Sequence, residues 1–244
     1  MKDSMETTTV TEDLMPLLFD LYSTSNEQLW RTNMVSSVNG ATSQGGRSAP
    51  ISNALDRSAF RVQRSLASAV VVGSKNVIAE GYHAPLSRPI TIDPDGLPLH
   101  KYPPLVVVTN GSTSLAKSAL LRDSTEKFTI ITSEVGRRSI AIDLGATDRA
   151  ADVVICGDEQ VDLVHARSVI DERFPGTKLV EGGPTLLTSM LNAGVLDQFS
   201  LTVTPKIAAR TAPFIGDYET SLRNLRLYKH LVVSDTLLLL YELQ

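Results

Sequence analysis

A carboxylate followed by two glycines and a proline is the stretch of this sequence best suited to chemistry. In residues 181–185, Glu181 follows an apolar run and is expected at the end of a buried strand. Gly182 and Gly183 would let the backbone approach a ligand without an intervening Cβ, and Pro184 suits the first position of a helix. The free N–H groups that follow, beginning at Thr185, would attract an anion. Taken alone, this segment is equally compatible with an ordinary strand-to-helix turn that carries a surface glutamate.

A row of arginines on one predicted helix supplies a second candidate group. Residues 52–67 form the clearest helical pattern, with apolar side chains on one face: Leu55, Ala59, Val62 and Leu66. The opposite face carries Arg57, Arg61 and Arg64. A solvated helix surface explains most of this row. Arg64, in the last turn, is the member that could turn toward a phosphate.

The elements that must position these groups follow from hydrophobic patterning. Continuous apolar runs predict strands buried on both faces, and therefore a mostly parallel sheet, at residues 69–73, 105–109, 128–132 and 153–156. Alternating patterns predict further strands at 29–38 and 199–204. Helices are expected after residues 11–13, after Asp162, and from Pro184 to a stop at Gly194. The runs at 231–233 and 237–241 predict a closing antiparallel pair.

These elements predict one α/β domain with a mostly parallel central sheet and antiparallel C-terminal strands. We expect residues 1–28 to form an N-terminal extension with a short helix, and residues 29–244 to form the domain. The proline-rich stretch between Gly81 and Pro104 has no periodicity. A loop of that length is expected to be a lid, a partner surface or disordered.

Bulk properties exclude several classes of protein. A formal net charge of −4 over 244 residues makes nucleic acid an unexpected partner. The single cysteine, Cys156, excludes an intrachain disulfide and lies in an apolar run, as an inert core thiol would. No apolar run approaches the about 18–20 residues that cross a bilayer, and the polar N-terminus lacks a signal-peptide core. We therefore expect a cytoplasmic protein with no membrane partner.

Common catalytic motifs are missing from the sequence. It contains no phosphate-binding P-loop, no dinucleotide fingerprint and no nucleophile elbow. Nor does it contain the signature of a zinc deaminase. No metal site is expected, because no metal-ligand spacing links the four histidines, which are His83, His100, His165 and His230. What remains is a set of glycine turns at strand ends, which suits a cleft for a large, phosphate-bearing small molecule.

Several segments, in order, resemble the RibD C-terminal family, the reductase domain of riboflavin biosynthesis, whose fold is like that of dihydrofolate reductase. They begin with Asn-Met-Val-Ser-Ser-Val-Asn-Gly and include Val-Glu-Gly-Gly-Pro-Thr-Leu-Leu, and they occupy residues 33–40, 46–52, 71–80, 180–187 and 193–205. The resemblance extends over roughly residues 29–243, and the glutamate–glycine–glycine–proline segment together with 193–205 is its most specific part.

The resemblance implies NADPH-dependent reduction of 5-amino-6-(5-phosphoribosylamino)uracil, a phosphorylated pyrimidine, with hydride transfer to the ribosyl C1′ and a ribitylamino product. It assigns catalytic roles to Asn39 and Glu181. It assigns substrate binding to Ser48, Arg64 and Glu181, with Arg64 suited to the phosphate. It assigns cofactor contacts to Pro50, Gly73, Asn76, Glu80, Gly182, Gly183, Pro184 and Thr185. It also implies a homodimer, for which the C-terminal strand pair is a plausible contact.

Three departures from the family keep two alternatives open. Asn39 stands where the family usually has an aspartate, and an amide cannot act as a carboxylate acid or base. Asn76 and Glu80 replace a frequent threonine and aspartate, and residues 81–88 replace a substrate-side motif. The first alternative is a dihydrofolate-reductase-like NADPH oxidoreductase with another small-molecule substrate. The second, favoured by Asn39, is a non-catalytic nucleotide-binding relative.

Overall fold

A computed structural model describes most of the chain. The described residues are 14–26, 28–86, 102–111, 115, 118–144 (backbone alone for 141–144), 151–209 and 223–244. The predicted helix cap at residues 11–13 and the greater part of the proline-rich stretch, residues 87–101, lie outside them.

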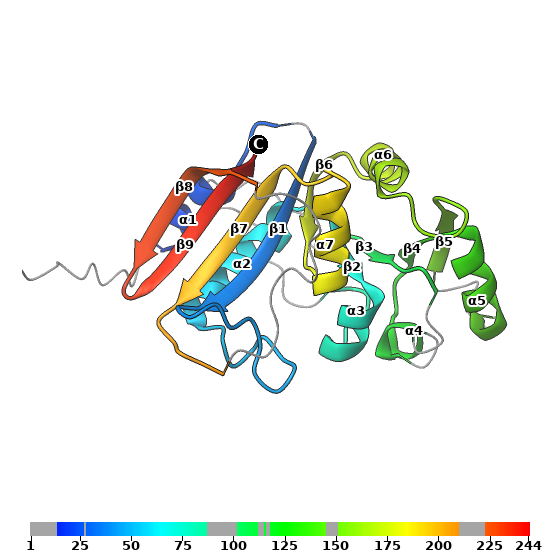
Figure 1. Ribbon diagram of the computed structural model, residues 1–244, viewed down its shortest axis with the longest axis horizontal. Coiled ribbons are helices and arrows are strands. Elements are labelled where there is room, and N and C mark those ends of the chain that lie inside the picture. Colours follow the sequence, from blue (N-terminus) through cyan, green and yellow to red (C-terminus); the bar gives the residue numbers. More distant parts are fainter. Residues whose placement is uncertain are drawn as a thin grey trace, which may run out of the picture.

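One sheet forms the centre of the described structure (Figure 1). Its nine strands are β1 (Gln28–Ser37), β2 (Ala69–Gly73), β3 (Leu105–Val108), β4 (Phe128–Thr132), β5 (Ala151–Ile155), β6 (Gly176–Val180), β7 (Gln198–Thr204), β8 (Leu225–Val233) and β9 (Thr236–Leu243). Their order is β5-β4-β3-β2-β6-β1-β7-β9-β8. Neighbours from β5 to β7 are parallel, whereas β9 pairs antiparallel with both β7 and β8. The predicted mixture of parallel and antiparallel strands is confirmed.

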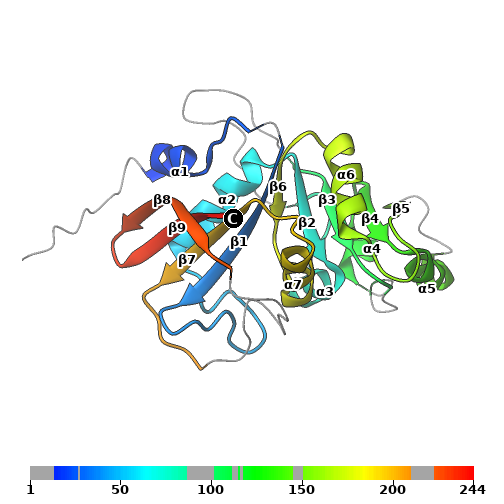
Figure 2. The same cartoon turned by 45° about the horizontal axis from the view of Figure 1, so that its top comes forward.

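Helices cover both faces of this sheet. They are α1 (Leu14–Tyr22), α2 (Ala54–Leu66), α3 (Ser74–Glu80), α4 (Ala119–Asp123), α5 (Glu134–Leu144), α6 (Leu163–Arg173) and α7 (Pro184–Asn192). Figure 1 shows α7 in front of the sheet and α2 behind it. The tilted view in Figure 2 shows α1 beside α2 and the β8–β9 pair, and buried side chains of these elements form one apolar cluster.

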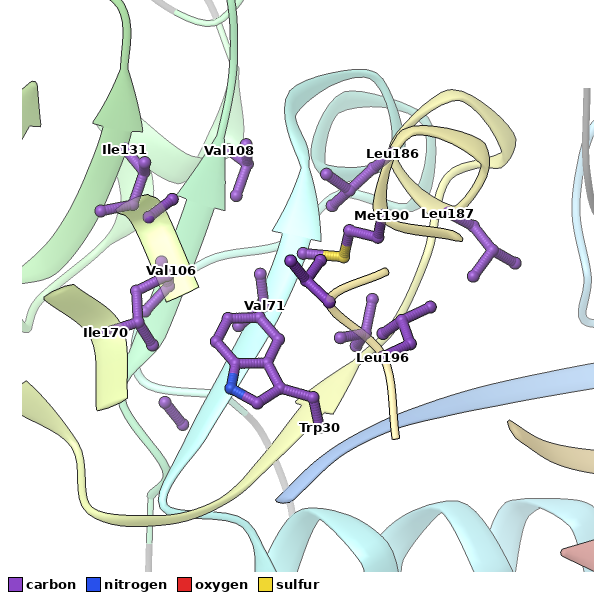
Figure 3. Close-up of a cluster of buried hydrophobic side chains, with 14 of the residues drawn as sticks. Trp30, Val71, Val106, Val108, Ile131, Ile170, Leu186, Leu187, Met190 and Leu196 are labelled. Atoms are coloured by element: carbon purple, nitrogen blue, oxygen red, sulfur yellow. The ribbon is translucent and has the colours of Figure 1, made fainter. Parts of the chain in front are cut away.

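The continuous apolar strands are buried on both faces, as their composition predicts. On β2, Val71 packs in the cluster of Trp30 and the α6 and α7 side chains (Figure 3). Its neighbours Val70 and Val72 pack on the opposite face, with side chains of α3, α4 and α5. Trp30 also donates a hydrogen bond from Nε1 to Asp171 at 2.8 Å. This double burial fixes the strand ends at which the candidate residues lie.

Local signals placed most element boundaries correctly. Asp162 caps α6 by accepting hydrogen bonds from two backbone N–H groups, and Gly194 follows α7 at φ +66°. Helix α2 begins after Asn53, which accepts from the Asp56 N–H, and so starts slightly later than its pattern predicts. Helices α3, α4 and α5 were not predicted, and the first two, with seven and five residues, are too short to establish a helical period. Cys156 is buried, as expected of a core thiol.

Two expectations about the chain ends stay predictions. Helix α1 packs against α2 and β8, but the division at residue 28 is not tested by this contact. The edge strand β8 leaves apolar side chains exposed, namely Leu225, Leu227, Tyr228 and Val232. That surface is where we expect the homodimer contact. Within the described residues, no helix is long and apolar enough to cross a membrane.

Candidate functional site

The glycine turn after β6 is held against the end of β2. The Glu181 N–H donates to the Val71 carbonyl at 2.9 Å, and the Gly73 N–H donates to the Gly182 carbonyl at 3.1 Å. Gly182 and Gly183 have φ values of +83° and +88°, which side chains with a Cβ rarely adopt. The glycines are therefore required by backbone conformation, and α7 begins directly behind them.

Glu181 and Arg64 form a bidentate ion pair at this turn. Arg64 Nε donates to Oε1 and Nη2 donates to Oε2, both at 2.6 Å, and the Tyr82 hydroxyl also donates to Oε2, at 2.7 Å. The two charged side chains are only 12% and 2% exposed. The Phe60 ring lies 4.2 Å from the Arg64 guanidinium carbon. The two residues assigned separately to the substrate thus bind each other in this structure.

Electrostatics at the pair favour its ionised form. Burial alone would lower the pKa of Arg64, but the adjacent Glu181 carboxylate outweighs it and raises that pKa above the usual value. Burial, and then the negative charge of Glu181, raise the pKa of Tyr82 well above the ordinary tyrosine value. Tyr82 therefore stays a hydrogen-bond donor to the carboxylate.

The ion pair lies in the wall of a cavity of about 1010 Å³. One part of the wall is the glycine turn and the start of α3, including Asn76, Gly183 and Thr185. Another part comes from α2 and β1, including Asn33 and Phe60. This volume is at the upper end of the usual range for small-molecule sites, about 300–1,000 Å³. It has room for a large cofactor together with a second molecule.

Most predicted site residues meet at this cavity. Nine of them line it: Ser48, Arg64, Gly73, Asn76, Glu80, Glu181, Gly183, Pro184 and Thr185. Asn76 Nδ2 donates to the Glu181 carbonyl at 3.2 Å, and the Ser48 hydroxyl donates to Glu80 at 3.4 Å. Three do not line it: Asn39, Pro50 and Gly182. Gly182 lies between two lining residues, and Pro50 is exposed and accepts from Lys206 through its carbonyl.

Asn39 joins two loops away from the cavity wall. Its Oδ1 accepts from the Ser37 hydroxyl at 2.7 Å and from the Ala208 N–H at 3.2 Å, while its Nδ2 donates to the Ala208 carbonyl at 2.8 Å. These bonds fasten the segment after β7 to the end of β1. The geometry therefore favours a positioning role over direct contact with a ligand.

We expect Asn39→Ala to lower the free energy of unfolding by about 1 kcal/mol, because it removes exposed hydrogen bonds of modest net worth. Cofactor affinity should be unchanged. Urea unfolding and a binding titration measure the two quantities. A large loss of turnover at unchanged stability would instead return Asn39 to a catalytic role.

Among the cavity-wall residues that sequence reasoning missed, three contribute most to the chemistry of the site, namely Phe60, Tyr82 and Asp56. Phe60 lies one helical turn before Arg64 and supports its guanidinium, but an aromatic residue on a helix gives no separate signal. Tyr82 lies at the start of a stretch without periodicity. Asp56, near the beginning of α2, is typical of an acid that complements a helix dipole.

Comparisons with known proteins agree with this architecture. The solved structure of a pyrimidine reductase-like protein from Corynebacterium diphtheriae is 18% identical, with a TM-score of 0.69 over 93% of this chain and 98% of that one. Riboflavin biosynthesis reductase Rib7 from Saccharomyces cerevisiae is 14% identical, with a TM-score of 0.65 over 96% and 100%. Dihydrofolate reductase from Enterococcus faecalis, complexed with NADP(H), is 12% identical, with a TM-score of 0.50 over 88% and 96%.

At these identities the solved structures establish the fold, which is like that of dihydrofolate reductase. No curated protein matches the chain in sequence. The family model described as the RibD C-terminal domain matches residues 31–239. Because this match extends over most of the chain, the protein belongs to the RibD C-terminal domain family.

Proposed function

We propose that the protein is an NADPH-dependent reductase of riboflavin biosynthesis that acts on 5-amino-6-(5-phosphoribosylamino)uracil. The observation that carries this proposal is that the glycine turn before α7 and the Arg64–Glu181 pair line the same cavity. Family membership supports the reductase class. The substrate and the cofactor are our inference from the resemblance and from this arrangement.

The glycine turn supports binding of the cofactor phosphates. The first backbone bond within α7 runs from the Leu187 N–H to the Gly183 carbonyl. The N–H groups of Thr185 and Leu186 precede it, so they have no acceptor within the helix and can bind an anion. A Cβ built on Gly183 would lie 3.5 Å from the Asn76 Cβ, in ordinary van der Waals contact, and the glycine leaves this part of the cavity wall without a side chain.

NADPH, when bound, supplies the hydride; the protein residues hold the substrate and exclude water. Arg64 and Tyr82 hold the Glu181 carboxylate rigidly in the cavity wall, where its remaining acceptor capacity can receive substrate hydroxyls. Arg64 Nη1 is not part of the bidentate pair, and it is the guanidinium nitrogen that we assign to the substrate phosphate. In this proposal the pair acts as one unit, with Glu181 positioned by Arg64.

The test is incubation of the protein with NADPH and the proposed pyrimidine, followed by loss of nicotinamide absorbance and identification of the ribitylamino product. Reactions without pyrimidine, and with NADH, are the controls. NADPH binding without turnover would contradict this substrate and favour an oxidoreductase of another small molecule or a non-catalytic nucleotide-binding protein. Absence of NADPH binding would contradict both enzyme hypotheses.

Removal of the Tyr82 hydroxyl tests the role of Glu181 in substrate binding. Tyr82→Phe keeps the ring beside Arg64 but removes the donor to Glu181 Oε2. Because hydrogen bonds to charged groups are worth about 1.5–3 kcal/mol, we expect the KM for the pyrimidine to rise about tenfold or more, with NADPH affinity unchanged. Steady-state kinetics and a fluorescence titration measure both. The exposed Tyr228 provides the control variant Tyr228→Phe, and a selective loss of NADPH affinity in Tyr82→Phe would refute the assignment.

A further inference from the structure

Helix α2 places a second buried carboxyl group in the cavity wall, that of Asp56. The residue is 6% exposed and belongs to the cavity lining. The Ser52 hydroxyl, which also lines the cavity, donates to Asp56 Oδ2 at 2.6 Å. The other oxygen, Oδ1, is shielded from solvent and has no hydrogen-bond partner among the described residues. A buried carboxyl oxygen without a well-formed hydrogen bond is rare in folded proteins, and this one can gain a partner if the carboxyl group turns toward a ligand in the cavity.

The charges around Asp56 do not neutralise it. Burial raises the pKa of Asp56 above the ordinary aspartate value, and the hydroxyls of Ser52 and Thr202 and the charges of Arg57 and Lys206 lower it only in part. Arg57 is exposed. The Lys206 ammonium is held by the Pro50 and Ser52 carbonyls. On the α1 side the titratable neighbour is Tyr22, whose pKa is itself raised to about 12, mainly by burial.

Polar atoms continue inward from this carboxyl group. The Thr202 hydroxyl on β7 is buried and does not line the cavity, and its interaction with Asp56 lowers the pKa of that carboxyl group. Asn33 on β1 lines the cavity too, and its Oδ1 accepts from Gln63 Nε2 at 2.7 Å. A packed interior without a ligand would place apolar side chains here, because unpaired buried polar groups are costly. The lining residues Asp56, Ser52 and Asn33 give this part of the wall a polar surface that suits a polar ligand.

We propose that the Asp56 carboxylate binds the ring of the substrate. That ring is a six-membered nitrogen heterocycle with adjacent N–H donors. This inference rests on the proposed function, which it deepens by naming the group that recognises the base. An ionised carboxylate is an acceptor only, so it selects an edge that carries donors. In a 6-aminopyrimidinedione, the ring N1–H lies beside the exocyclic N–H, and one carboxylate can accept from both. The soft Cβ–Cγ torsion of aspartate lets the carboxyl group turn to share its oxygens between Ser52 and the ligand.

The probe is 6-aminouracil, which has this donor edge but no sugar or phosphate. Its N1-methyl derivative lacks one of the two hydrogen-bond donors and serves as the matched control ligand. We expect Asp56→Asn to weaken 6-aminouracil binding about ten- to a hundredfold, as expected for hydrogen bonds to a charged group. NADPH affinity should not change. N1-methylation should weaken binding to the wild type far more than to Asp56→Asn. The control variant is Asp123→Asn, which changes an exposed carboxylate of α4.

A pH titration separates recognition by the carboxylate from a purely structural role. Donors on the ligand stabilise the ionised carboxyl group, so wild-type affinity should rise as the pH increases through the pKa of free Asp56. That transition should lie above the ordinary aspartate value, and Asp56→Asn should abolish it. Ser52→Ala keeps Asp56 but removes a hydrogen bond that lowers its pKa, so the same transition should move to higher pH.

The outcomes distinguish this inference from the function on which it rests. If the wild type reduces the pyrimidine but Asp56→Asn binds 6-aminouracil with the same affinity and pH dependence, the role of Asp56 is wrong and the proposed function stands. If Asp56→Asn does not fold, an unchanged transition in Ser52→Ala overturns the role instead. If the wild type neither binds 6-aminouracil nor reduces the pyrimidine, both proposals fail.

Discussion

Replacing Arg64 with alanine should lower the free energy of unfolding by about 3–5 kcal/mol, the usual cost of leaving one partner of a buried ion pair without its counter-charge. The Glu181 side chain is only 2% exposed, and it would lose the charged partner that its burial requires. Tyr82 would remain as its side-chain hydrogen-bond donor. The loss of the guanidinium also removes the contact with the Phe60 ring. Urea unfolding at neutral pH measures the change.

A double-mutant cycle shows whether the loss comes from the pair. Arg64→Ala together with Glu181→Ala should cost less than the sum of the two single changes, because neither charge is then left alone. Arg57→Ala, on the exposed face of the same helix, should change stability by no more than about 0.5 kcal/mol. Additive single and double changes would mean that the two side chains do not stabilise each other.

The buried strands were predictable because a strand that is buried on both faces has a continuous run of apolar residues. Residues 69–73 and 105–109 are continuous apolar runs, and both became inner parallel strands. Helix α6 was predictable from the cap at Asp162. Helix α3 left no comparable trace, because a single short segment between a strand and a loop offers too few repeats.

The candidate site was predictable as a set of residues but not as a set of contacts. Glu181 and Arg64 each have a local reason to be noticed, one at a strand end and the other in a helix's last turn. They are 117 positions apart, and only the packing of α2 beside β6 brings them together. Asp56 shows the opposite case, since its local signal indicates a helix start and conceals its burial in the cavity wall. The order and packing of the elements therefore determine which charged side chains come into contact.

The glycine turn leads to the sharpest test of the cofactor site. Gly183→Ala should raise the Kd for NADPH at least about tenfold, because it adds a methyl group at the cavity wall beside Asn76, where we propose that the cofactor phosphates bind. At φ +88° the alanine should also cost about 1–3 kcal/mol of stability. A fluorescence titration and urea unfolding measure the two effects separately.

Gly194, at the other end of α7, supplies the matched control for backbone strain. Its φ is +66°, and a Cβ built there meets no atom within 4 Å. Gly194→Ala should therefore cost about 1–2 kcal/mol of stability through its left-handed backbone, and NADPH affinity should stay unchanged. Equal losses of NADPH affinity in both variants would assign the effect to strain in α7. A loss confined to Gly183→Ala would support cofactor phosphates at the start of this helix, because Gly183 lines the cavity and Gly194 does not.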